Sequence, residues 1–262
     1  MTLGKIIILA VLQGVTEFLP VSSSGHLLIA QRLFDLSNVP LAFDVLLHLG
    51  SLIAILFFFR KGIFRLLAGK KIDGNSEERQ KGRIFFLIIL SSLPVAVAGL
   101  FFREKIELFF ESLRVLGICF LISAALLFST KRFGKKRGKT IEEISVSDAL
   151  VVGVAQALAI LPGISRSGAT IVTGIWSGFS LATAFIFSFL LAIPAIAGAF
   201  VLELPKVAEQ SGGWQFGLVG LFVSSLVSFF SLKLLKNLLE KERLFWLGGY
   251  CLLVGLGLLF FR

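Results

Sequence analysis

The stretch "GVTEFLPVSSSGH", residues 14–26, places a carboxylate, three consecutive hydroxyls and a histidine inside an apolar segment, Thr2–Phe34. Proline, glycine and serine lie in the middle of this segment, and proline and glycine interrupt helices. The pattern predicts two short half-helices that meet at a turn rather than one continuous span. A second apolar segment, Val146–Phe179, is interrupted in the same way. We call these two stretches the first and second broken segments.

The two broken segments resemble each other. "VLQGVTEFLPVSSSG", from Val11, aligns without gaps on "VAQALAILPGISRSG", from Val154, with matching Val, Gln, Ser, Ser and Gly. The similarity is weak by itself, but it falls on both broken segments. Repeats with discontinuous helices typically place a binding site near the midplane of a membrane, and we expect the site there.

The composition indicates an integral membrane protein. Of the 262 residues, 56% are hydrophobic and 16% are charged, and the mean hydropathy is +0.93. A soluble chain with a large core is the less favoured alternative. Six apolar runs approach the roughly 20 residues that a helix needs to cross a bilayer. These predicted spans are Leu41–Phe59, Ile84–Phe102, Leu113–Phe128, Thr183–Leu204, Phe216–Leu235 and Leu244–Phe261.

The basic residues predict the topology. The net charge of +10 does not indicate a nucleic-acid partner, because Lys and Arg cluster between apolar runs, at Arg60–Arg83, Lys131–Lys139 and Lys233–Arg243. We expect these three stretches to be cytoplasmic, and Arg103–Arg114 and Glu203–Gln210 to lie on the outer side. These assignments are consistent only if each broken segment returns to the side from which it entered. The first then enters from the outside, and the second enters from the cytoplasm.

The predicted fold is therefore all-α, with two inverted repeats of a re-entrant half-helix pair and three transmembrane helices each. The repeats are residues 1–130 and 145–262 of one membrane domain, 1–262. Met1–Leu12 has a lysine and an apolar stretch, but no small-residue cleavage site follows before Glu17, so we expect it to belong to the mature fold. Cys119 and Cys251 lie far apart in apolar segments and are interpreted as packing residues.

The serines of both broken segments precede a predicted half-helix and can cap it: Ser22, Ser23 and Ser24 with Gly25, and Ser165 and Ser167 with Gly168. Capped N-termini with free N–H groups form an anion site if the two turns converge. Arg166 would add a planar fork suited to phosphate or carboxylate. The alternative for the serines is that they only satisfy backbone groups, and for Arg166 it is a buried ion pair with Glu17 that joins the repeats.

The remaining polar residues suggest metal and proton chemistry. Gln13 and Glu17 are four residues apart and share a helix face, with oxygens that suit Mg²⁺ or Ca²⁺ when a polyphosphate supplies further ligands. Glu17 is alternatively a base, and His26 a nucleophile or proton carrier. Asp44 and His48 are interpreted as a packing or supporting pair, with a proton relay as the alternative.

"QGVTEFLPVSSSGH" and "LPGISRSGAT" resemble the two signature stretches of the undecaprenyl-diphosphate phosphatase, or bacitracin-resistance, family. "FDVLLHLGSLIAILFF", "LPVAVAGLF", "DALVVGVAQALAILPGISRSGATIV" and "FSFLLAIPAIAGA" resemble that family in the same order along most of the chain. The resemblance implies a phosphatase that converts undecaprenyl diphosphate to undecaprenyl phosphate and inorganic phosphate, recycling the lipid carrier of cell-wall synthesis. It also implies a divalent cation, and a site reached from the outer face of the bacterial inner membrane.

By this resemblance, Glu17 falls on the catalytic acidic position, and Gln13 on a position that is often Glu. Because Gln13 cannot act as a base, it has at most a ligand or orienting role. Ser22–Ser24 and His26 fall on the hydroxyl and histidine positions. The phosphate-binding stretch corresponds to Ser165, Arg166, Ser167 and Thr170.

The mechanism predicted at this point has Arg166 and the half-helix N-termini holding the diphosphate. A divalent cation bridges it to Glu17, and Ser23, His26 or water attacks the terminal phosphorus. The competing function is a secondary transporter or lipid-phosphate flippase, since such carriers share the architecture. The expected partners are a prenyl diphosphate and membrane lipid, and the sequence is compatible with a homodimer.

Overall fold

The computed structural model describes residues 2–36, 39, 41–62, 76–102, 109, 112–133, 138–209 and 214–260. Within these ranges the chain is helical, and its strand-like pairing is limited to one isolated parallel bridge between Lys139 and Phe179. The elements, in chain order, are α1 (Leu3–Thr16), α2 (Ser23–Leu33), α3 (Leu41–Phe58), α5 (Ser76–Phe101), α7 (Leu113–Phe133), the 3-10 helix η1 (Ile141–Glu143), α8 (Val146–Leu158), α9 (Arg166–Trp176), α10 (Leu181–Glu209), α11 (Trp214–Glu240) and α12 (Leu244–Phe260).

Each broken segment folds as two short helices, as predicted: α1 and α2 form the first, and α8 and α9 the second. The caps are the expected serines. Ser22 Oγ accepts a hydrogen bond from the Gly25 N–H (3.4 Å), and Ser165 Oγ accepts one from the Gly168 N–H (3.1 Å). Only the cap residues precede the helices, however. Residues 23–25 and 166–168 were also expected to precede the helices, but they form the first helical turns. The reason is that a cap satisfies the N–H groups directly after it.

The predicted spans are helices, but several extend beyond the apolar run. α5 begins at Ser76 rather than Ile84, α7 ends at Phe133, and α11 ends at Glu240. α10 likewise includes most of the stretch expected to be an outer loop, up to Glu209. The reason is that Lys, Arg and Glu are good helix formers, so a helix continues where hydropathy stops.

Within the described part of the chain, four helices have apolar stretches long enough to cross a membrane: Gln80–Phe101, Leu113–Arg132, Leu181–Pro205 and Phe216–Glu240. The other two predicted spans, in α3 and α12, are also apolar but shorter, at Phe43–Phe58 and Leu244–Phe260. The fold is therefore that of a multi-pass helical membrane protein.

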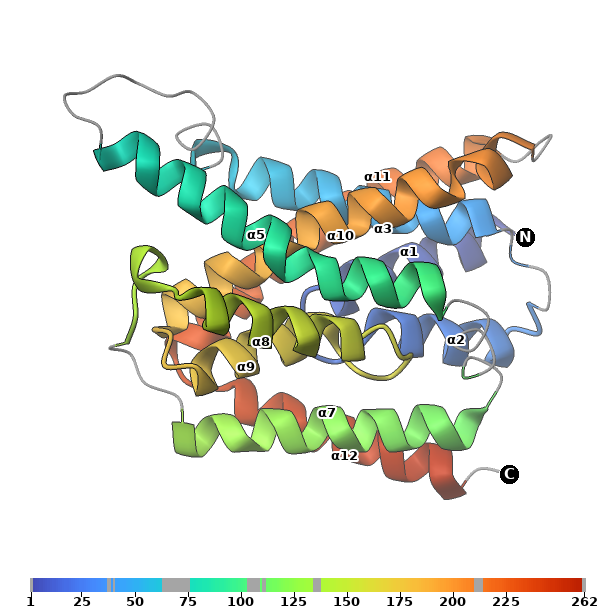
Figure 1. The fold of residues 1–262 in the computed structure, drawn as a ribbon. Helices are drawn as coiled ribbons and strands as arrows, with labels where there is room; N and C mark the ends of the chain where they lie inside the picture. Colours follow the sequence, from blue (N-terminus) through green and yellow to red (C-terminus); the bar gives the residue numbers. More distant parts are fainter. Residues whose placement is uncertain are drawn as a thin grey trace.

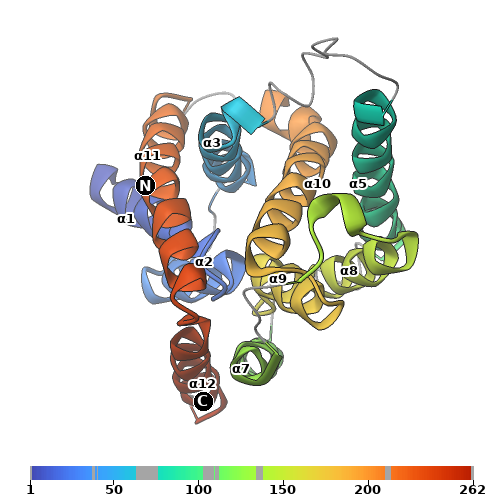
Figure 2. The same cartoon turned by 90° about the vertical axis from the view of Figure 1, so that its left-hand side faces the viewer.

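The broken segments lie between longer helices (Figure 1). α7 packs along α12 at one edge of the molecule, and α3 packs along α11 toward the opposite edge, as Figure 2 also shows. Both outer ends of the α1–α2 pair lie on the side of the two chain termini. Both outer ends of the α8–α9 pair lie on the opposite side (Figure 1).

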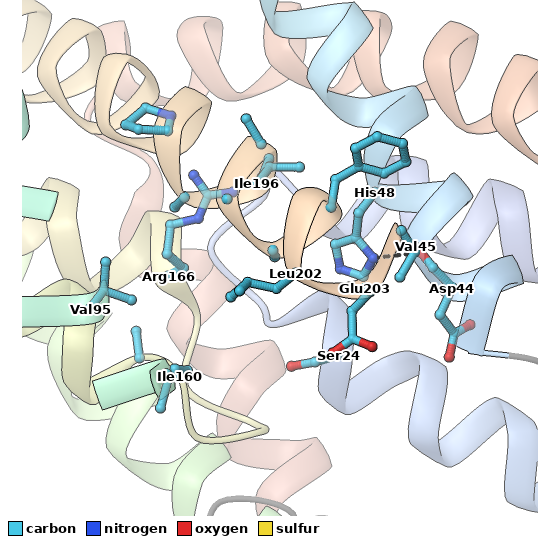
Figure 3. A pocket seen from close by; sticks show the side chains of 18 of the residues that line it. Ser24, Asp44, Val45, His48, Val95, Ile160, Arg166, Ile196, Leu202 and Glu203 are labelled. Carbon is cyan, nitrogen blue, oxygen red and sulfur yellow. Dashed lines mark hydrogen bonds between the residues drawn. The ribbon is translucent and has the colours of Figure 1, made fainter. Parts of the chain in front are cut away.

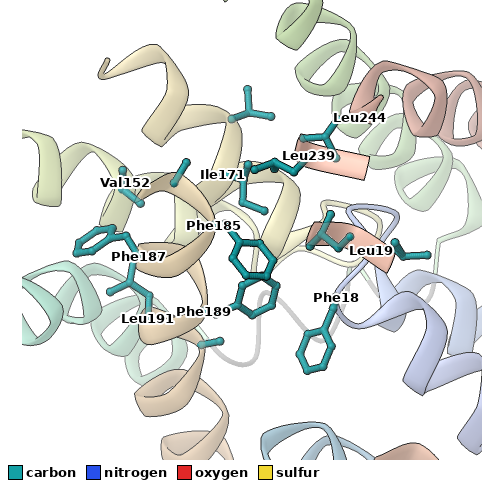
Figure 4. Close-up of a cluster of buried hydrophobic side chains, with 14 of the residues drawn as sticks. Phe18, Leu19, Val152, Ile171, Phe185, Phe187, Phe189, Leu191, Leu239 and Leu244 are labelled. Atoms are coloured by element: carbon teal, nitrogen blue, oxygen red, sulfur yellow. The ribbon is translucent and has the colours of Figure 1, made fainter. Parts of the chain in front are cut away.

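A large hydrophobic cluster holds the turn after α1 in place (Figure 4). Phe18 and Leu19 follow Glu17 directly and are buried in this cluster. The Phe18 ring meets the Phe189 ring of α10 edge to face, with centroids 5.3 Å apart. Burying these two large side chains of the turn fixes the position of Glu17 relative to α10.

The turns of the two broken segments touch. Ser22 Oγ accepts a second hydrogen bond from the Gly163 N–H of the other turn (3.0 Å). Ser123 of α7 donates to the Gly163 carbonyl (2.9 Å) and accepts from the Ser165 N–H (3.0 Å). The two turns therefore converge, which is the condition that the anion-site hypothesis required, and α7 contributes a contact that the repeat alone did not indicate.

Candidate active site

A cavity of about 920 Å³ opens between α2, α3, α5, α10 and the second broken segment (Figure 3). Most of its wall is aliphatic, contributed by residues such as Leu28, Val95 and Ile160. Its polar and charged lining residues are Glu17, Ser24, Gln31, Asp44, His48, Ser92, Gln156, Arg166 and Glu203. An apolar chamber with a few polar groups suits an amphiphilic ligand.

Glu17 is the centre of the polar contacts. It ends α1 as the C-terminal cap and is only 8% exposed. Its Oε1 accepts a hydrogen bond from Arg166 Nη2 (2.6 Å), and its Oε2 accepts bonds from Ser23 Oγ (2.5 Å) and Gln13 Nε2 (2.9 Å). The carboxylate thus joins a hydroxyl from the first broken segment to a guanidinium from the second.

Arg166 forms the ion pair that was the alternative explanation for its presence. The pair does not use the whole guanidinium, because Nη1 is buried and has no hydrogen-bond partner among the described residues. An arginine fork offers several donors, and Arg166 is one of the residues that line the cavity. Arg166 can therefore hold Glu17 and still bind an anion.

The oxygens of Gln13 and Glu17 fit a hard divalent cation only in part. Gln13 is fully buried, and its Oε1 has no hydrogen-bond partner in the described part of the chain. Oxygen ligands of this kind suit Mg²⁺ or Ca²⁺. The described residues contain no group of three or more His, Cys, Asp or Glu side chains that could hold a metal ion. A cation here would need further oxygens from a ligand.

His26 does not line the cavity. Its Nδ1 lies 2.7 Å from the Ser22 carbonyl, and its Nε2 lies 2.6 Å from the Tyr250 hydroxyl of α12. The imidazole stacks on the Tyr250 ring, with centroids 5.6 Å apart. Both ring nitrogens are therefore engaged within the protein, whereas the Ser23 hydroxyl contacts the carboxylate.

Most of the predicted phosphate-binding residues are buried beside the cavity rather than in its wall. Thr170 Oγ1 contacts the Arg166 carbonyl and Ser188 Oγ, and Ser165 Oγ lies 3.2 Å from Ser167 Oγ. Gly25 and Gly168 allow close approach, since a Cβ on Gly168 would lie 3.1 Å from the Pro20 side chain. Of this predicted set, Ser24 and Arg166 line the cavity.

The structure adds residues that the sequence ranked low. His48 Nε2 lies 3.7 Å from Glu17 Oε2, and Asp44 accepts hydrogen bonds from Gln31 (3.0 and 3.1 Å). Their helical spacing indicated a shared face, but not that this face meets Glu17. Gln156 also lines the cavity. Its only sequence signal was the match to Gln13 in the repeat.

The chain resembles known proteins over almost its whole length. The family model described as "Bacitracin resistance protein BacA" matches residues 6–257. An undecaprenyl-diphosphatase of Alkaliphilus metalliredigens is 39% identical, with 97% of each chain covered. One of Carboxydothermus hydrogenoformans is 40% identical over 97% of this chain and 95% of the relative, and one of Korarchaeum cryptofilum is 38% identical over 99% of each.

Proposed function

The chain belongs to the bacitracin resistance protein BacA family, and from this membership we propose that it hydrolyses undecaprenyl diphosphate to undecaprenyl phosphate and inorganic phosphate. The observation that carries the proposal at the site is Glu17 between the Ser23 hydroxyl and the Arg166 guanidinium. A nucleophile, a base and an anion-binding group thus meet beside a cavity with a largely aliphatic wall. A carrier has no need of a nucleophile.

The geometry favours Ser23 as the nucleophile. Glu17 Oε2 takes the proton as Ser23 Oγ forms a bond to the terminal phosphorus, and the bond from that phosphorus to the bridging oxygen breaks. The prenyl monophosphate leaves, and water then hydrolyses the phosphoserine to release inorganic phosphate. Arg166 stabilises the charge on the transferring group, and this electrostatic contribution is the larger part of phosphoryl transfer.

Gln13 Oε1 and a Glu17 oxygen would hold Mg²⁺ or Ca²⁺, together with oxygens of the diphosphate. When bound, the cation would neutralise charge on the phosphate oxygens. Gln13 also orients Glu17 through its Nε2 hydrogen bond, which keeps the carboxylate facing Ser23. An orienting role is compatible with the chemistry of Gln13, because its side-chain amide cannot act as a base.

Two inverted repeats remain our proposal for the membrane topology, with six full spans and re-entrant α1–α2 and α8–α9 pairs. Helix packing supports it. The helices α1, α3, α5 and α7 of residues 1–130 correspond in order to α8, α10, α11 and α12 of residues 145–262. Exchanging each helix for its equivalent converts the α1–α11 contact into the α8–α5 contact, and both contacts are present. The same exchange leaves the α7–α12 and α3–α10 contacts unchanged. The basic ends then face the cytoplasm of a bacterial inner membrane, and the cavity faces outward.

The first test is phosphate release from a long-chain prenyl diphosphate by purified protein in detergent, with Mg²⁺, Ca²⁺ or a chelator. We expect release that the chelator suppresses and that Glu17→Ala lowers by at least about 100-fold. Glu142→Ala is the matched control and should retain activity, because Glu142 is an exposed acidic residue of η1 that does not line the cavity. No release from folded wild-type protein would refute the phosphatase and point to transport assays in vesicles.

Trapping the intermediate tests the nucleophile. Rapid acid quenching after addition of substrate labelled at its terminal phosphate should leave an acid-stable phosphoserine that Ser23→Ala abolishes. An acid-labile adduct that disappears in His26→Ala would instead assign His26. Release without any covalent adduct would indicate direct attack by water.

A further inference from the structure

Gln156 lies in the last part of α8 and lines the cavity, yet it is only 1% exposed. Neither Nε2 nor Oε1 of its amide has a hydrogen-bond partner among the residues that the structure describes. A buried amide without partners is costly, and buried polar groups in proteins are nearly always paired. The fold itself therefore gives no reason for an amide at this position.

The repeat explains why Gln156 is unpaired. Its equivalent in the first broken segment, Gln13, donates to Glu17 four residues later on the same helix face. In the second broken segment, the residue four positions after Gln156 is Ile160, which also lines the cavity but accepts no hydrogen bond. The amide donor is present in both repeats, and the carboxylate acceptor in only one.

The charge of the neighbouring wall indicates what would bind. Arg166 Nη1 is the second buried donor of this wall without a partner in the described chain, and it is cationic. Two unpaired donors, one of them charged, suit a ligand with several anionic oxygens. We propose that Gln156 Nε2 donates a hydrogen bond to a non-bridging oxygen of the substrate's diphosphate, making Gln156 a substrate-binding residue. This inference rests on the proposed phosphatase function.

Two variants test it. Gln156→Leu keeps the approximate size and removes the donor, and Gln156→Glu keeps the shape and adds negative charge. Ser91→Ala is the matched control, because Ser91 of α5 donates to the Ala149 carbonyl of α8 (2.7 Å) without lining the cavity. The readouts are KM and kcat for prenyl diphosphate hydrolysis, and the rise in unfolding temperature caused by methylenediphosphonate, a diphosphate analogue that is not hydrolysed.

We expect KM to rise about tenfold in Gln156→Leu and further in Gln156→Glu, with kcat less affected. The analogue should stabilise wild type and Ser91→Ala but neither Gln156 variant. The ligand-free unfolding temperature of Gln156→Leu should equal or exceed that of wild type, because a buried unpaired amide has been removed.

The inference is overturned if KM and the analogue-induced shift are unchanged in both variants. It is also overturned if ligand-free Gln156→Leu unfolds at a lower temperature while the analogue-induced shift persists, since the amide would then have a structural role. If wild type releases no phosphate but the analogue stabilises it and not the Gln156 variants, the phosphatase proposal fails while the binding role of Gln156 stands.

Discussion

At Glu17 each carboxylate oxygen has a separate task. Oε1 faces Arg166, and Oε2 faces the Ser23 hydroxyl and the Gln13 amide. The arrangement prevents Arg166 from remaining an isolated charge inside a membrane protein, which costs about 2.5–3.5 kcal/mol at a helix centre on insertion scales. The ion pair and the phosphate-binding role are therefore compatible, since one guanidinium edge serves each.

Arg166→Lys tests this division. A lysine can retain the ion pair with Glu17 but cannot present a second planar donor to phosphate, so we expect kcat/KM for prenyl diphosphate to fall at least about tenfold with little change in unfolding temperature. Arg60→Lys is the control, because Arg60 is exposed just after the end of α3, donates to the Phe57 carbonyl, stacks on the Phe57 ring and does not line the cavity. Near-normal turnover in Arg166→Lys would refute the argument from the fork.

At the scale of elements, the turns between half-helices determine the site. Gly163 has φ +93°, and a Cβ there would lie 2.7 Å from the Cys119 Cβ and 2.8 Å from the Leu116 carbonyl. Its own N–H and carbonyl bond to Ser22 and Ser123. This turn therefore requires both a left-handed backbone and close approach to α7, which glycine permits.

Gly163→Ala should destabilise the protein by roughly 2–4 kcal/mol, from the unfavourable φ together with overpacking. Thermal unfolding in detergent measures the effect. Two controls separate its causes: Gly178→Ala has φ +86° with only the Lys139 side chain 3.8 Å away, and Gly198→Ala has no atom within 4 Å of the added Cβ. If Gly163→Ala and Gly178→Ala lower the unfolding temperature equally, crowding against α7 does not contribute to the loss of stability.

At the scale of the whole molecule, the two broken segments open toward opposite sides and meet by their turns. The outer ends of α1 and α2 lie on the side of the termini, and those of α8 and α9 lie on the other (Figure 1). One turn supplies the carboxylate and the other supplies the guanidinium. The pair of Glu17 and Arg166 therefore forms only when both halves are assembled.

Cysteine labelling tests the topology. Leu33→Cys, at the end of α2, and Glu142→Cys, in η1, are at exposed positions near opposite sides. A membrane-impermeant maleimide should label Leu33→Cys in intact spheroplasts and Glu142→Cys only after permeabilisation. Wild type should remain unlabelled, because Cys119 and Cys251 are buried. Labelling of both positions from outside would contradict the inverted arrangement.

Four features could be predicted from the sequence alone: the helical membrane class, the two interrupted segments, the capping serines and the importance of Glu17 and Arg166. These features depend on local chemistry: proline and glycine break helices, serine caps them, and a charge in an apolar run needs a partner. Helix ends were less predictable, as α5 and α11 show, because helix propensity continues beyond the apolar run.

Which side chains meet depends on the tertiary fold. It turned His26 toward Tyr250, brought His48 beside Glu17, and left the Gln156 amide unpaired in the cavity wall. Each of these outcomes depends on how helices distant in sequence pack against one another, and the spacing of residues along one helix contains no information about the helix that faces it.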